Sequence, residues 1–141
     1  MRLPIALVAL LASLTVTEAQ QGRHLTPISR TGEAVTGQVT LSATAIRFAN
    51  GRSLPLALVD ANARGVFDSA GSGTVTARIY RVTSAANPVL RNGNTLCGAP
   101  VTHLVVYEPS PGGVHLNFYQ GAERPAGRGA DKLCFFSAYE G

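Results

Sequence analysis

The sequence predicts a single all-β domain, a small antiparallel barrel or sandwich of about seven strands with one disulfide. Three observations lead to this fold class. Apolar and polar residues alternate with a period of two along most of the chain, as in strands with one buried face. Clusters of Gly, Pro and Asn separate these runs at short intervals. After residue 19 no stretch keeps helical spacing, and no repeat or linker divides the 141 residues.

The first residues are expected to be a signal peptide rather than part of the fold. An uncharged, mostly apolar run over residues 3–16 follows Arg2, and Thr17 and Ala19 are the small residues that a signal peptidase reads. This run is shorter than the roughly 20 residues that span a bilayer. We therefore expect a soluble, periplasmic or secreted protein with no transmembrane span. The expected organisation is a signal peptide at 1–19, a flexible mature N-terminus at 20–34 and a single β domain at 35–141.

Three alternating runs begin the expected domain, and an Asn50-Gly51 turn separates the last two. A three-residue loop ending at Gly51 would place Ile46 beside Leu54 and keep apolar residues on one face, so we prefer it to a two-residue turn. Pro55 lacks an amide hydrogen and favours an edge position for the third strand. The expected strands cover residues 35–41, 44–49 and 53–59, followed by a connection over residues 60–73.

The second half of the chain contains four more expected strands. Residues 84–100 hold two turn signals and are expected to be mostly loop with one short helical turn. A Gly, Pro and charged segment over 121–132 is expected to be a second loop. The expected strands cover residues 74–82, 102–108, 114–120 and 133–139.

The hairpin formed by 102–108 and 114–120 has two faces of different chemistry. With a five-residue loop over 109–113, one face is apolar and should be core, because it contains Leu104, Val106, Leu116 and Phe118. The other face carries amphipathic side chains around Val105 that suit partner recognition, although the same residue types occur on ordinary solvated β faces. If this face is exposed, replacing both of its tyrosines by alanine should leave stability nearly intact. The candidate binding residues and their cross-strand pairs are His103 with Tyr119, Asn117 with Val105, and Tyr107 with His115.

The two cysteines predict one disulfide. Cys97 and Cys134 are the only pair available, and exported proteins fold in an oxidising compartment. Closing a loop of this length constrains the unfolded chain by roughly 4 kcal/mol. No CxxC spacing indicates redox chemistry, and no His or Cys spacing indicates a zinc site.

Charge and motifs exclude several function classes. The net charge is +4, but eleven arginines and one lysine are dispersed along the chain, so we expect no nucleic-acid partner. No cofactor or metal motif is present, and His103 and His115 lack an evident third metal ligand. A small hydrolase using one of these histidines stays an alternative, although no GxSxG elbow accompanies them.

Two resemblances add to this interpretation. Residues 87–98, 101–107 and 133–134 resemble small exported proteobacterial β proteins of uncharacterised function. Residues 46–54, and the Ser-Gly pair within Gly71, Ser72 and Gly73, resemble the C-type lysozyme inhibitors, which are small periplasmic β-barrels. The second resemblance implies an inhibitory loop at Gly71, Ser72 and Gly73. The chain departs from that family at Ala49, near the position where the family has a cysteine.

The function expected from the sequence is therefore that of an exported, non-enzymatic β domain, monomeric or a small homo-oligomer. Its expected partner is an unidentified protein or a component of the cell envelope. An inhibitor of a secreted hydrolase such as lysozyme is the first alternative, and a small hydrolase is the second.

Overall fold

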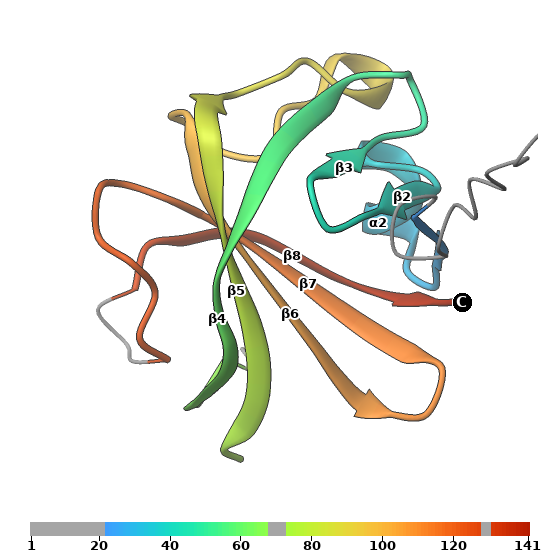
Figure 1. Ribbon diagram of the computed structural model, residues 1–141. Coiled ribbons are helices and arrows are strands. Elements are labelled where there is room, and N and C mark those ends of the chain that lie inside the picture. Colours follow the sequence, from blue (N-terminus) through green and yellow to red (C-terminus); the bar gives the residue numbers. More distant parts are fainter. Residues whose placement is uncertain (1–21, 68–72, 128–130) are drawn as a thin grey trace, which may run out of the picture.

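The computed structural model describes residues 22–67, 73–127 and 131–141, and their strands close into an antiparallel barrel. Neighbouring strands in the barrel are also neighbours in the sequence, except for β1 and β8, which pair to close it (Figure 1). The all-β class and the barrel alternative are thereby confirmed, with eight strands. The strands are β1 (Arg23–Pro27), β2 (Val39–Leu41), β3 (Ala45–Arg47), β4 (Ser53–Gly65), β5 (Val75–Ala86), β6 (Val101–Ser110), β7 (Gly113–Gln120) and β8 (Leu133–Glu140), with helices α2 (Arg30–Val35) and η1 (Arg91–Gly93).

The eighth strand comes from the segment that was expected to be flexible. β1 pairs with β2 over residues 23–25 and with β8 over residues 26–27, so this short strand closes the barrel. Leu25 is fully buried, and Ser29 caps α2 by accepting a hydrogen bond from the amide of Gly32. The prediction of a flexible segment over residues 20–34 is wrong for its described part. Five residues are too few to show a clear alternation, and their pairing partners are distant in the sequence.

The predicted register of both hairpins is confirmed. Ile46 pairs with Leu54, and the β6–β7 hairpin pairs every predicted couple of its outer face. The predicted five-residue loop is wrong, because the pairing continues to Ser110 and Gly113 after a register shift beyond Tyr107. A β-bulge absorbs the extra residue there and leaves a tighter turn.

β4 runs further than the sequence predicts and is not an edge strand. It continues through the expected connection to Gly65, with register shifts at residues 58–60 and 60–63 that obscure the alternation. Pro55 opposes Ala45 of β3, and the β4–β5 ladder begins one residue later at Leu56. The missing amide hydrogen of Pro55 therefore interrupts neither ladder, and the edge prediction is wrong.

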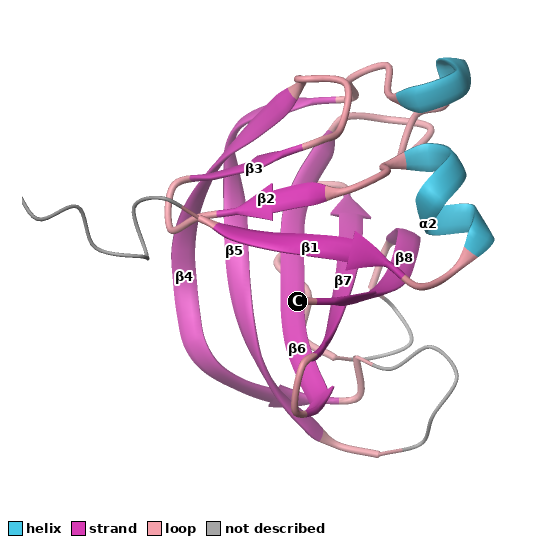
Figure 2. Ribbon diagram, turned by 90° about the vertical axis from the view of Figure 1, so that its right-hand side faces the viewer, coloured by secondary structure: helices cyan, strands magenta, loops and turns pink. Residues whose placement is uncertain are grey.

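The barrel lumen holds the main core, which includes the predicted core residues of the β6–β7 hairpin. One end of the barrel is closed. Figure 2 shows α2 at that end, next to the turn that contains η1. Beneath the helix, the buried hydroxyls of Thr36 and Tyr139 are 2.7 Å apart and hydrogen-bonded. The short helical turn predicted within residues 84–100 is η1. The lumen core contains Leu25, Ile46, Phe48, Leu54, Leu104, Val106, Leu116 and Phe118, among others.

The predicted disulfide between Cys97 and Cys134 is present, with a Cα–Cα distance of 5.2 Å. It joins the loop before β6 to the second residue of β8. Because the two cysteines are 37 residues apart, the bond should stabilise the fold by roughly 4 kcal/mol through the unfolded chain.

Candidate functional site

The outer face of the β6–β7 hairpin, predicted as a binding surface, is buried. Asn117 is 2% exposed and Tyr119 is 3% exposed, and His103 and Tyr107 are also buried, while His115 is half-buried. These side chains point away from the lumen core, because the alternate residues of the same strands fill it. Tyr107, near the end of β6, also borders the cavity described below. Tyr107 and Tyr119 belong to a second hydrophobic cluster outside the barrel lumen. Its other members include Phe67, Ala77 and Ile79, with Leu133 packed against them.

A segment distant in sequence covers this second cluster. The side-chain amide of Asn117 donates a hydrogen bond to the carbonyl of Phe67, 2.6 Å away. The amide of Val66 donates to the carbonyl of Gly127, which ties the end of β4 to the loop after β7. Gly127 has φ +72° and lies against the backbone of Gly65, so a side chain at this position would clash.

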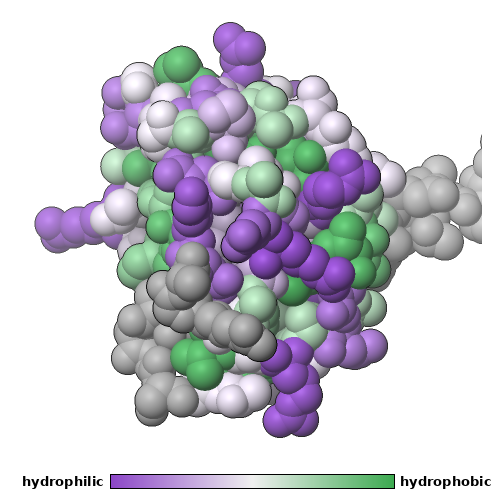
Figure 3. All heavy atoms as spheres, turned by 90° about the vertical axis from the view of Figure 1, so that its left-hand side faces the viewer, coloured by the Kyte–Doolittle hydropathy of each residue, from purple (hydrophilic) through white to green (hydrophobic). Residues whose placement is uncertain are grey.

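The covering loop is also held by charge. Arg124 forms an ion pair with Asp60 at 3.1 Å and donates to the carbonyl of Val59, and Asp131 accepts from the amides of residues 126 and 127. Figure 3 shows the side of the molecule that carries this loop, where hydrophobic side chains are scattered among hydrophilic ones.

The two histidines of this face make local hydrogen bonds. His103 Nδ1 is 3.0 Å from the hydroxyl of Thr102, and His115 Nδ1 is 2.9 Å from the hydroxyl of Tyr107. Burial, followed by the charges of Arg124 and Arg81, lowers the pKa of His103. Burial also raises the pKa of the Tyr119 hydroxyl, which stays protonated at neutral pH. No group of three His, Cys, Asp or Glu side chains suited to a metal occurs among the described residues.

The proposed inhibitory loop falls mostly outside the described residues. Gly71 and Ser72 belong to that part of the chain, and Gly73 is exposed with open space around its Cα.

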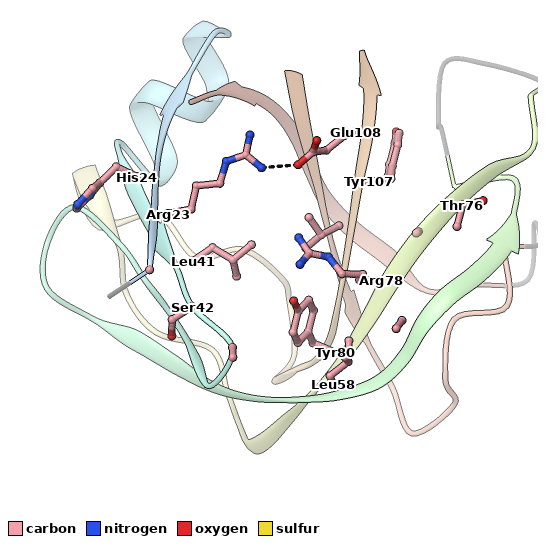
Figure 4. Close-up of a pocket in the computed structure, with 15 residues that line it drawn as sticks. Arg23, His24, Leu41, Ser42, Leu58, Thr76, Arg78, Tyr80, Tyr107 and Glu108 are labelled. Carbon is pink, nitrogen blue, oxygen red and sulfur yellow. Dashed lines mark hydrogen bonds and ion pairs between the residues drawn. The ribbon is translucent and has the colours of Figure 1, made fainter. Parts of the chain in front are cut away.

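The structure contains a cavity that sequence reasoning missed, at the end of the barrel opposite α2. It has a volume of about 950 Å³ and is lined by residues 22–24, 41–43, 58, 61, 76–78, 80 and 106–108. Figure 4 shows these side chains around the opening between β1 and β2 on one side and β4, β5 and β6 on the other. Because α2 closes the other end of the barrel and the core between is packed, a small molecule would enter the cavity through this mouth, as far as the described residues show.

The inner wall of the cavity is apolar. Leu41 of β2, Tyr80 of β5 and Val106 of β6 are buried lumen residues that line it. Leu58 of β4 also lines it and is 49% exposed, which places it at the rim. Below this wall, the other apolar side chains of the lumen core pack the barrel, so the cavity is a blind pocket.

The rim of the cavity is charged. Arg23 of β1 donates to the carboxylate of Glu108 on β6, and its other terminal nitrogen donates to the carbonyl of Gly141 at 2.7 Å. Arg78 points from β5 into the opening, and its guanidinium carbon is 5.9 Å from the centre of the Tyr80 ring (Figure 4). Among the residues that the structure describes, Arg78 makes no ion pair.

Comparison with known proteins identifies no relative. No protein-family model, curated protein or solved structure matches this chain. Within the described part of the chain, no helix is long and apolar enough to cross a membrane.

The sequence contained one signal for the cavity. Residues Thr76, Arg78 and Tyr80 alternate with Val75, Ala77 and Ile79, and the apolar set would ordinarily be assigned to the main core. In the structure Ala77 and Ile79 belong to the outer cluster, and the set with Arg78 faces the lumen. The position of Arg78 in the lumen-facing row of β5 is therefore the sequence feature that indicates the cavity.

Proposed function

We propose that this protein is an exported, non-enzymatic binding protein that holds one small, largely apolar molecule in the mouth of its barrel. The observation that supports this proposal is the blind cavity of about 950 Å³ with its apolar wall. This volume lies at the upper end of the range found for small-molecule sites, and eight-stranded barrels have room for one small ligand. Export is supported by the expected signal peptide and by the disulfide.

The side chains at the cavity favour binding over catalysis. Ser42 and His24 both line it, but Ser42 donates to the carbonyl of Ala45, and His24 is hydrogen-bonded to Thr40. In Figure 4 His24 points away from the opening, so these contacts assemble no nucleophile and base. The earlier expectation of a partner bound by the β6–β7 face loses support, because that face is covered.

Titration with Nile red, a neutral apolar fluorophore, tests the proposal on the purified, oxidised protein. We expect a saturable rise in fluorescence with one site per chain. Leu58→Asp should strongly weaken this binding, because it replaces an apolar side chain at the rim of the cavity with a charge that the dye must pass or contact. The matched control is Val59→Asp, since Val59 is the next residue of β4, is 37% exposed and lies outside the cavity.

Both variants replace exposed residues, so thermal unfolding should show that each remains folded. Absence of saturable binding in the native protein would overturn the proposal. Equal loss of binding in both variants would also overturn it, because the dye would then occupy the outer surface.

A further inference from the structure

The charges around the cavity are not equivalent. Arg23 directs one terminal nitrogen to Glu108 and the other to the carbonyl of Gly141, so both ends of its guanidinium are occupied. Glu108 is neutralised by the same contact. Arg78 is then the one cation lining the opening without an ion pair among the described residues.

Arg78 is placed where a ligand head group would lie. It occupies the lumen-facing row of β5 between Tyr80, which is part of the apolar wall, and Thr76, which lies nearer the solvent. Residues two apart on a strand are about 7 Å apart along its axis. Arg78 is exposed and therefore presents its planar fork of donors between the apolar wall and the solvent.

The blind shape of the cavity sets the direction of a ligand. Because the packed core closes the inner end, the apolar part of a ligand must enter first and contact Leu41, Tyr80 and Val106. Its head group then stays at the rim, at the level of Arg78. An arginine in this position favours a carboxylate or phosphate, which can accept two parallel hydrogen bonds.

We infer that the cavity selects an amphipathic anion, with an apolar tail against Leu41, Tyr80 and Val106 and an anionic head at Arg78. This inference rests on the proposed binding function and adds the chemical class of the ligand. The Arg23–Glu108 pair borders the head group without adding net charge.

Displacement of bound Nile red by molecules with one tail and different heads tests this inference. Decanoate should displace the dye at a concentration about tenfold or more below that needed for decanol or decylammonium. Decyl phosphate separates a phosphate preference from a carboxylate preference, and either anion supports the inference.

Substitutions at Arg78 then locate the head group. Arg78→Met should remove the preference for the anion while Nile red affinity stays the same, and Arg78→Glu should shift the preference to decylammonium. The matched control is Arg81→Met, an exposed arginine three residues later on β5 and on its opposite face. It should keep the preference of the native protein.

The outcomes separate the two proposals. If Nile red does not bind, the binding function fails, and the inference fails with it. If Nile red binds but the heads displace it equally, or Arg78→Met keeps the anion preference, the inference is overturned and the apolar binding function stands.

Discussion

The side-chain amide of Asn117 lies 2.6 Å from the carbonyl of Phe67, and this hydrogen bond joins β7 to the segment that covers its outer face. Both residues are almost fully buried. Asn117 therefore links the second cluster directly to the backbone of the segment that covers it. Its contact explains why a face rich in His, Tyr and Asn is inaccessible to a partner.

Asn117→Ala should lower the free energy of unfolding by about 1 to 3 kcal/mol, because it leaves a buried carbonyl without its donor. The amide of Val66, bonded to Gly127 in the same cover, should also exchange its hydrogen faster. Chemical denaturation and hydrogen exchange measure the two effects. Asn62→Ala, at an exposed asparagine of β4, is the control and should change neither. Unchanged exchange at Val66 in Asn117→Ala would contradict the assigned contact.

Tyr119→Ala should cost about 3 kcal/mol or more of unfolding free energy, since it empties a buried aromatic site. This outcome is the opposite of what an exposed recognition face would give. Phe136→Ala is a matched control, because Phe136 is an aromatic residue of β8 that is 54% exposed. Its loss should cost less than about 1 kcal/mol. Equal stability of the two variants in urea denaturation would show that Tyr119 is not core.

His103 should make stability depend on pH. Its pKa in the folded protein lies below the ordinary value of 6.5, so the unfolded chain takes up the proton first as pH falls. Stability from the neutral imidazole is complete above pH 6.5 and is lost as pH falls toward the lowered folded-state pKa. His103→Gln should therefore flatten the pH dependence of the unfolding free energy between about pH 7.5 and about pH 5.5, above most carboxyl pKa values.

A direct check on His103 is an NMR titration of its ring protons. A midpoint at or above 6.5 would contradict the expected direction. So would an unfolding free energy whose pH dependence is the same in the native protein and in His103→Gln.

Glu108→Gln should free Arg23 at the rim of the cavity. The pair is well exposed to solvent on both sides, so its loss should lower stability by less than about 1 kcal/mol. Decanoate should bind several-fold more tightly, because a second arginine is no longer neutralised, while Nile red binding stays constant. Glu123→Gln, in the loop after β7, should change neither ligand. Displacement titrations measure both, and weaker decanoate binding in Glu108→Gln would contradict the role assigned to the rim charges.

The alternation of apolar and polar residues was sufficient to predict the strand pairing in hairpins, where the two strands are neighbours in the sequence. The pairing of Ile46 with Leu54 and the register of the β6–β7 hairpin follow from alternation and short connections, because a one-residue slip would reverse the buried faces. The disulfide follows from the presence of just two cysteines. The barrel closure by β1 did not follow, because its partners β2 and β8 are set by contacts across the chain.

The sequence by itself determined which residues of the β6–β7 hairpin share a face, since side chains alternate along every strand. Only the tertiary structure decided what each face meets. Phe67 and Gly127 return over the outer face and bury Asn117 and Tyr119, while barrel closure turns Arg78 toward the lumen. Alternation specifies the two faces of a strand but not which face is exposed to solvent, because burial depends on segments that approach from far along the chain. The candidate site therefore lies at the open end of the barrel and not on the face whose composition had suggested it.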